Sequence, residues 1–195
     1  MFLKRTGALA LILAFVWGTL PVSEAALPLS LPNNLPVRES AIALSAASSI
    51  PQELLQLDPK ELARYMKKNF QFRDDVSLFG VADYWQNPAE FLTRGAGDCE
   101  DYALFSNLVF QMQGRESYVV SLYDAAGYGH TVTLFREDGK WNLMNEDRVY
   151  YYRAEFIQEV LTRIHPLWTW AAIARQYRNQ GQAMAVLKNP SLSPT

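Results

Sequence analysis

Cys99 is the only cysteine in the chain, and it stands in the stretch Gly97-Asp98-Cys99-Glu100-Asp101-Tyr102-Ala103. The chain begins like an exported protein, and a single thiol in an exported chain is buried and inert, paired between chains, or kept free for chemistry. A glycine-rich loop precedes Cys99 and an apolar helical pattern follows it, which predicts that Cys99 lies at or next to the N-terminus of a helix. The helix dipole and the free N–H groups at such an end favour a thiolate. We interpret Cys99 as a candidate nucleophile, with a buried structural thiol as the alternative.

A cysteine hydrolase also needs an imidazole and a group that orients it. His130 begins a strand-like pattern after a Gly-flanked loop, and Asn145 ends the next strand pattern. The turn signal at 138–139 predicts a hairpin that brings His130 and Asn145 together. We therefore expect Asn145 to orient His130, and Asp147 is the alternative if the strand carries a bulge. Both could also be ordinary residues at a strand end.

Hydrophobic periodicity, helix-capping residues and turn residues predict the helices and strands that carry Cys99, His130 and Asn145. Two helix starts have an N-cap followed by proline and glutamate, at Asp58 and at Asn87, and the second helix should end near Gly95. The nucleophile helix should run from Asp98 to a stop at Gly114. Strands are predicted at 117–123, 130–136 and 141–145, and helices at 154–163 and 166–178. This order predicts an α+β domain, with the nucleophile helix packed on an antiparallel sheet.

The first residues read as an export signal. Met1 to Arg5 is a short basic start, residues 8–20 form an apolar core, and Ser23 and Ala25 suit cleavage after Ala25. We expect residues 1–25 to be a signal peptide, 26–50 an extended arm, 51–187 the folded domain and 188–195 a tail. The apolar run is short for a membrane span, so we expect no span after cleavage; an uncleaved anchor is the alternative. The expected location is periplasmic or secreted.

Charge excludes one class of partner. The full chain has a formal net charge of −2 at pH 7, and it shows no basic stripe of the kind that binds nucleic acid. His and Cys residues form no metal-binding motif, and no internal repeat is present.

The stretch from about Glu61 to Tyr152, about half of the chain, resembles the transglutaminase-like superfamily, most closely its bacterial cysteine-proteinase branch. The resemblance rests on four motifs: Asp83-Tyr84-Trp85-Gln86-Asn87-Pro88 with Glu90, the block around Cys99, Gly129-His130-Thr131-Val132 and Gly139-Lys140-Trp141-Asn142-Leu143-Met144-Asn145. The resemblance implies a papain-like α+β fold and a Cys-His-Asp triad, with Cys99 as nucleophile and His130 as general base. The family usually has Asp as third member, whereas the matching position here is Asn145. An amide can fix the imidazole tautomer but lacks the charge that stabilises imidazolium.

Acids around the nucleophile raise the question of a metal. Some proteases of the resembled branch bind calcium beside the nucleophile, and Asp98 and Glu100 match those positions, with Asp101 as a further candidate. Calcium requires several oxygen ligands. The alternative is that these acids only cap the helix and favour its first turn. No cofactor is required by this interpretation, and calcium is a candidate ligand.

The sequence therefore predicts an exported cysteine peptidase or amidohydrolase that acts on protein or peptide substrates through an acyl-enzyme. The oxyanion would be held by the Cys99 backbone N–H and one further donor, for which Trp85 and Gln86 are candidates. One alternative is transglutaminase chemistry, in which the acyl group passes to an amine. Another is a non-catalytic papain-like binding module of the cell envelope, which the Asn145 departure favours.

Overall fold

The computed structural model describes residues 48–174 and 185–190, which belong to one compact unit. The predicted signal peptide and nearly all of the predicted arm lie outside the described residues. Within the described ranges, no helix has the length and apolar character needed to cross a bilayer.

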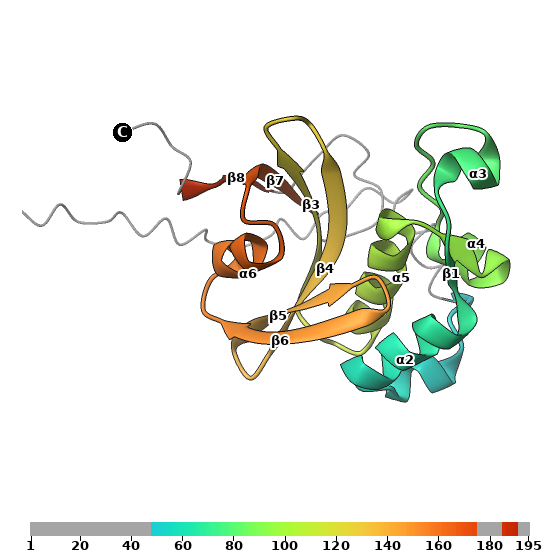
Figure 1. The fold of residues 1–195 in the computed structure, drawn as a ribbon. Coiled ribbons are helices and arrows are strands. Elements are labelled where there is room, and N and C mark those ends of the chain that lie inside the picture. The colour runs from blue at the N-terminus through green and yellow to red at the C-terminus, as the bar shows by residue number, and fades with distance from the viewer. Residues whose placement is uncertain (1–47, 175–184, 191–195) are drawn as a thin grey trace, which may run out of the picture. The chain divides into compact units, whose positions relative to one another are not determined.

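Helices dominate the first half of the fold (Figure 1). The elements there are η1 (Gln52–Gln56), α2 (Pro59–Asn69), β1 (Gln71–Phe72), α3 (Asp75–Phe79), α4 (Pro88–Arg94), β2 (Ala96–Gly97) and α5 (Cys99–Met112). Both predicted capping boxes are present, at Asp58 before α2 and at Asn87 before α4. Gly95 ends α4 with a positive φ, as predicted. The short parallel pair β1–β2 leads directly into α5.

A six-stranded antiparallel sheet and one helix make up the second half of the described chain. Its elements are β3 (Ser117–Asp124), β4 (Gly129–Glu137), β5 (Lys140–Asn145), β6 (Arg148–Ala154), α6 (Ile157–Ile164), β7 (Trp168–Ala174) and β8 (Ala185–Lys188). The strand order is β6-β5-β4-β3-β7-β8. The turn between β4 and β5 has positive φ at both Asp138 and Gly139, which confirms the predicted hairpin.

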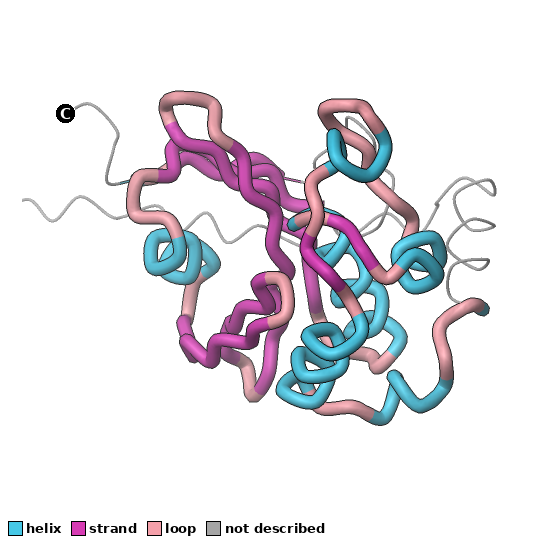
Figure 2. The backbone as a smooth tube through the Cα atoms, turned by 45° about the vertical axis from the view of Figure 1, so that its right-hand side comes forward, coloured by secondary structure: helices cyan, strands magenta, loops and turns pink. Residues whose placement is uncertain are grey.

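The sheet separates two hydrophobic cores, and Figure 1 and Figure 2 show α5 and α6 on opposite sides of it. One core packs α2, α4 and α5 against the sheet, with Phe91, Phe105 and Phe110 fully buried. The other core packs α6 on the opposite face, with Leu134 and Trp168 fully buried. The structure thus confirms the α+β class and the packing of the nucleophile helix on the sheet.

The prediction of a helix at 166–178 is wrong for residues 168–174. Trp168–Ala174 forms β7, which lies between β3 and β8, and residues 175–178 lie outside the described residues. A short run in which almost every residue is apolar gives no decisive hydrophobic period, so it can be read as either a helix or a strand. The helix predicted at 154–163 begins later, at Ile157, because Ala154 ends the unpredicted strand β6. Asn189, in the predicted tail, is buried and donates to the Trp168 carbonyl.

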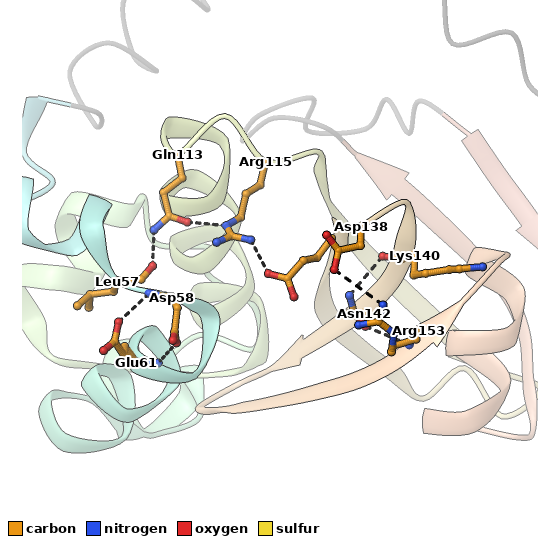
Figure 3. A network of polar contacts seen from close by, with 10 residues as sticks. Leu57, Asp58, Glu61, Gln113, Arg115, Asp138, Lys140, Asn142 and Arg153 are labelled. Carbon is orange, nitrogen blue, oxygen red and sulfur yellow. Dashed lines mark hydrogen bonds and ion pairs between the residues drawn. The ribbon is translucent and has the colours of Figure 1, made fainter.

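A polar network holds the C-terminal end of α5 to both halves of the fold (Figure 3). Gln113 donates to the Leu57 carbonyl at 2.8 Å, which ties this end to the start of α2. Arg115 donates to Gln113 at 3.0 Å and pairs with Glu137 at 2.9 Å near the β4–β5 turn. These contacts fix α5 at the end opposite to Cys99.

Candidate active site

Cys99 is the first residue of α5, as predicted. The helix starts there because Asp98 is extended and the Asp101 carboxylate accepts the Asp98 backbone N–H at 3.3 Å. An N–H at the first helical position has no partner within its own helix. The Cys99 thiol and its backbone N–H therefore lie at the same end of α5, as an acyl-transfer site requires.

The thiol of Cys99 lies between an acid and a backbone amide. Its sulfur donates to Oε2 of Glu100 at 3.1 Å, and the Thr131 backbone N–H donates to it. Burial raises the pKa of the Cys99 thiol, and the Glu100 carboxylate raises it further. The expectation that the helix end favours a thiolate is wrong for this arrangement. Burial and the neighbouring acids raise the thiol pKa by more than the helix dipole and the Thr131 amide lower it.

His130 and Asn145 contact one another. Nε2 of His130 lies 2.9 Å from Oδ1 of Asn145. Because an amide oxygen only accepts, Nε2 carries the proton in this hydrogen bond and Nδ1 is the unprotonated ring nitrogen. Met144 pairs with Thr133, so His130 is a diagonal neighbour of Asn145 rather than directly opposite it.

Asp147 lies in the turn between β5 and β6. Asn145 is the last residue of β5 and pairs with Arg148, so the strand ends there without a bulge. Asp147 lies 3.7 Å from Arg148, an exposed ion pair of little energetic value. The structure brings Asn145 to His130 and directs Asp147 to another partner.

Five acids from three segments converge beside the thiol. Ligand oxygens of Asp75, Asp83 and Glu100 lie within 4.8 Å of one another, and so do those of Asp75, Asp98 and Asp101. Asp75 comes from α3 and is 2 % exposed. Oδ1 of Asp75 and Oδ1 of Asp98 are both buried without a hydrogen-bond partner.

Crowding of these acids disfavours their charged forms. Burial, followed by the neighbouring Glu100, raises the pKa of Asp98 to about 8, and burial also raises the pKa values of Glu100 and Asp75. Buried carboxylates with unused oxygens are what a hard divalent cation binds. The residues present therefore fit calcium.

Asp101 has a different set of contacts. Its Oδ1 accepts the Gln86 backbone N–H at 2.8 Å, and its Oδ2 accepts the Gln86 side-chain amide at 2.6 Å. Both residues are fully buried. A Cβ on Gly97 would lie 2.1 Å from Oδ2 of Asp101, so glycine is required there by space. We call Gly97, Gln86 and Asp101 the buried clamp; it holds the segment before α4 against the first turn of α5.

The two oxyanion candidates differ in the donors they have available. Gln86 donates its side-chain amide to Asp101 and to the Ala96 carbonyl at 2.9 Å, so both N–H bonds are used within the fold. Trp85 donates its indole N–H to Oδ1 of exposed Asp83 at 2.9 Å. An exposed acceptor is readily exchanged for another, and Trp85 is therefore the better candidate donor.

Sequence reasoning missed Asp75, Asp83, Thr131 and the pairing of Asp101 with Gln86. Asp83 and Gln86 belong to the motif at 83–88, but no local sequence pattern shows that this segment contacts the first turn of α5. Asp75 follows the N-cap Asp74 and reads as an ordinary acid in a first helical turn. Only the three-dimensional fold brings α3 to the start of α5.

No family model matches the chain, and no curated protein matches it. Among solved structures, EGTA-treated LapG of Legionella pneumophila matches with 16% identity and a TM-score of 0.43, over 78% of this chain and 91% of that one. Calcium-bound LapG matches with 15% identity and a TM-score of 0.42, over 75% and 80%. A structure titled as a TGase matches with 16% identity and a TM-score of 0.38, over 62% of this chain and 34% of that one.

Proposed function

We propose that the protein is a cysteine peptidase or amidohydrolase that acts on peptide or isopeptide bonds, with Cys99, His130 and Asn145 as its catalytic residues. The observation that carries the proposal is the hydrogen bond from His130 Nε2 to Asn145 Oδ1, next to a thiol at a helix start. The thiol contacts the backbone of Thr131, the residue after His130. This arrangement supplies a nucleophile, a base and the group that orients the base.

The chemistry follows from these positions. Nδ1 of His130 takes the thiol proton, and the Cys99 sulfur attacks the carbonyl carbon to form a C–S bond. The backbone N–H of Cys99 and the indole N–H of Trp85 stabilise the oxyanion. The C–N bond then breaks as the imidazolium gives its proton to the leaving amine. Water, deprotonated by His130, hydrolyses the thioester and restores the thiol.

We further propose that the acids beside the thiol bind calcium. Asp75, Asp83, Asp98 and Glu100 would hold the ion, whereas Asp101 has both oxygens bonded to Gln86. When bound, the ion supplies positive charge where the acids otherwise raise the pKa of the thiol. Among these ligands Glu100 is the group that accepts the thiol proton in the structure.

The test is peptide cleavage measured by mass spectrometry. A peptide mixture is incubated with the purified protein in calcium chloride or in EGTA, and a fluorescent primary amine in parallel reactions detects acyl transfer. Cleavage that Cys99→Ser and His130→Ala abolish supports the proposal. Amide formation with the amine indicates transglutaminase chemistry instead. No product from an intact, calcium-loaded protein contradicts both.

One observation favours a second function. The Cys99 thiol is half-buried and donates to Glu100, and burial raises its pKa; a thiol held in its protonated form suits a non-catalytic module that binds peptides. Iodoacetamide separates the two functions. Alkylation of Cys99 that calcium accelerates indicates an enzyme, and a thiol silent under both conditions indicates a binding module.

We also propose that the protein is exported, to the periplasm or beyond, after cleavage of residues 1–25. The basic start and apolar core of this segment support the proposal. Mass spectrometry of protein from its native cell envelope should find Ala26 as the N-terminus, whereas an intact Met1 would indicate a membrane anchor.

A further inference from the structure

Two stacked aromatic side chains lie on the sheet near the thiol. Tyr123 of β3 pairs in register with Gly129 of β4 on one side and with Trp170 of β7 on the other. The rings of Tyr123 and Trp170 are stacked, with centroids 4.0 Å apart and an interplanar angle of 15°. Trp170 is 39% exposed, although tryptophan side chains are highly buried on average. We call Tyr123 and Trp170 the aromatic shelf.

The shelf lies on the face of the sheet that carries α5. Thr133 donates its hydroxyl to the Ala103 carbonyl of α5 at 2.7 Å, which identifies this face. Alternation along β4 places Thr131 on the same face, where its hydroxyl lies 2.9 Å from that of Ser121. The Thr131 backbone N–H bonds the Cys99 thiol. The cross-strand pair Ser121–Thr131, which we call a row of the sheet, therefore adjoins the thiol.

The row formed by Tyr123 and Gly129 is the next one on this face, about 7 Å farther along the strands. Because α5 starts at Cys99 and runs over the sheet toward Phe135, the shelf lies on the other side of the thiol, beyond the helix. Electrostatics agree with this position, since the charges of Asp83 and Glu100 and the neighbouring thiol add to burial in raising the pKa of Tyr123.

Tyr123 is held in place before any ligand arrives. A Cβ on Gly129 would lie 2.9 Å from Cε1 of Tyr123, so the ring packs directly over the glycine backbone beside His130. Trp170 covers the ring from β7. A rigid aromatic surface binds an apolar side chain without first losing rotamer freedom.

We propose that the aromatic shelf is the subsite that binds an apolar side chain of the peptide substrate, adjacent to the bond that Cys99 attacks. The proposal rests on the proposed peptidase function and adds its substrate preference. α5 covers the sheet on one side of the thiol, so a peptide that brings its carbonyl to the thiol extends along the other side, where the half-exposed Trp170 ring of the shelf lies. Covering apolar atoms with the two rings supplies the preference.

The test compares two covalent probes, the chloromethyl ketones of acetyl-Leu-Leu and acetyl-Gly-Gly, with iodoacetamide. We expect the leucine probe to label Cys99 at least about tenfold faster than the glycine probe, as side-chain selectivity in apolar sites allows. Tyr123→Ala and Trp170→Ala should each bring this ratio close to one, while the iodoacetamide rate changes by less than about twofold. Tyr123→Phe should keep the ratio, because it keeps the ring.

Tyr150→Ala is the matched control, since Tyr150 stacks with Tyr152 in the core on the opposite face. It should leave the ratio unchanged, and circular dichroism checks that each variant is folded. Gly129→Ala should lower the ratio by displacing the Tyr123 ring. Equal labelling by the two peptides in the wild-type protein, or a ratio unaffected by Tyr123→Ala, overturns the shelf and leaves the peptidase intact. Labelling that His130→Ala does not slow overturns the peptidase itself.

Discussion

Opposing influences act on the thiol of Cys99. Its position at the start of α5 and the Thr131 amide favour the thiolate, whereas burial and the Glu100 carboxylate favour the thiol. In the described structure burial and the Glu100 carboxylate are the stronger influences, so the sulfur keeps its proton and donates it in a hydrogen bond to Glu100. The residue is therefore a nucleophile whose reactivity depends on what neutralises its neighbours.

Replacing Glu100 tests this balance. Glu100→Gln removes the negative charge, so the thiol pKa should fall and a larger fraction should be thiolate at neutral pH. Because burial remains, we expect iodoacetamide alkylation in EGTA to accelerate by roughly 3- to 10-fold, where tenfold corresponds to one pKa unit. The measurement is the alkylation rate against pH. A midpoint that stays in place or moves to higher pH would refute the assigned role of Glu100.

Substitutions also show which of Asn145 and Asp147 orients His130. Asn145→Ala removes the only contact that orients His130 in the described structure, and it should slow peptide-probe labelling of Cys99 by roughly 10-fold or more. Asp147→Ala breaks only an exposed ion pair and should stay close to the wild-type rate. The reverse order of effects would make Asp147 the third member of the triad.

At the scale of elements, the buried clamp determines how the segment before α4 contacts α5. Gly97, Gln86 and Asp101 come from a strand, a loop and a helix, and they fit together without space for one more carbon atom. This fit explains why glycine precedes the acid-rich start of α5. It also fixes Trp85, the residue before Gln86, close to the nucleophile.

Gly97→Ala should therefore destabilise the fold by at least about 2 kcal/mol, since overpacking and the loss of a buried hydrogen bond both apply. Gly80→Ala is the control, because its Cβ meets no atom within 4 Å and only its positive φ is strained. That change should cost about 1 kcal/mol. Urea unfolding measures the stability of both variants. Equal losses in the free energy of unfolding would show that the buried clamp has space for the added Cβ.

Local signals predicted the elements that carry the nucleophile and its partners. The capping residues, the turn at Asp138 and Gly139 and the helical period after Cys99 are short-range features, and each corresponds to an observed element. The strand β7 could not be predicted, because its apolar run is set by burial between β3 and β8. The convergence of α3 with α5, and with it the role of Asp75, depends on tertiary packing that no spacing in the sequence encodes.

At the scale of the whole molecule, the acids link stability to pH. The pKa of Asp98 is raised to about 8 in the folded protein, above its usual value of about 4. Its contribution to stability is therefore fully present below about pH 4 and is lost as pH rises through 8. In EGTA, the melting temperature should fall over this range. Asp98→Asn should flatten the decline and melt at a higher temperature than the wild type near pH 8.

Calcium should reverse the same destabilisation. An ion that binds only the folded state adds about 2.7 kcal/mol when its concentration is 100 times its Kd. We expect calcium chloride to raise the melting temperature near pH 8, and Asp75→Asn to abolish the rise, because Asp75 joins α3 to the acids of α5. Glu53→Gln, which removes an acid far along the chain in η1, is the control and should keep it. An equal rise in both variants would place the bound ion elsewhere.

The most direct test of the central claim is to trap the acyl-enzyme. The protein is mixed with a peptide p-nitrophenyl ester in calcium chloride, and the reaction is quenched in acid. The protein is then digested, and mass spectrometry measures the masses of the fragments. We expect an acyl adduct on the fragment that contains Cys99, formed much more slowly in His130→Ala and absent in Cys99→Ser. An adduct on another residue, or one that forms at the same rate without His130, would contradict it.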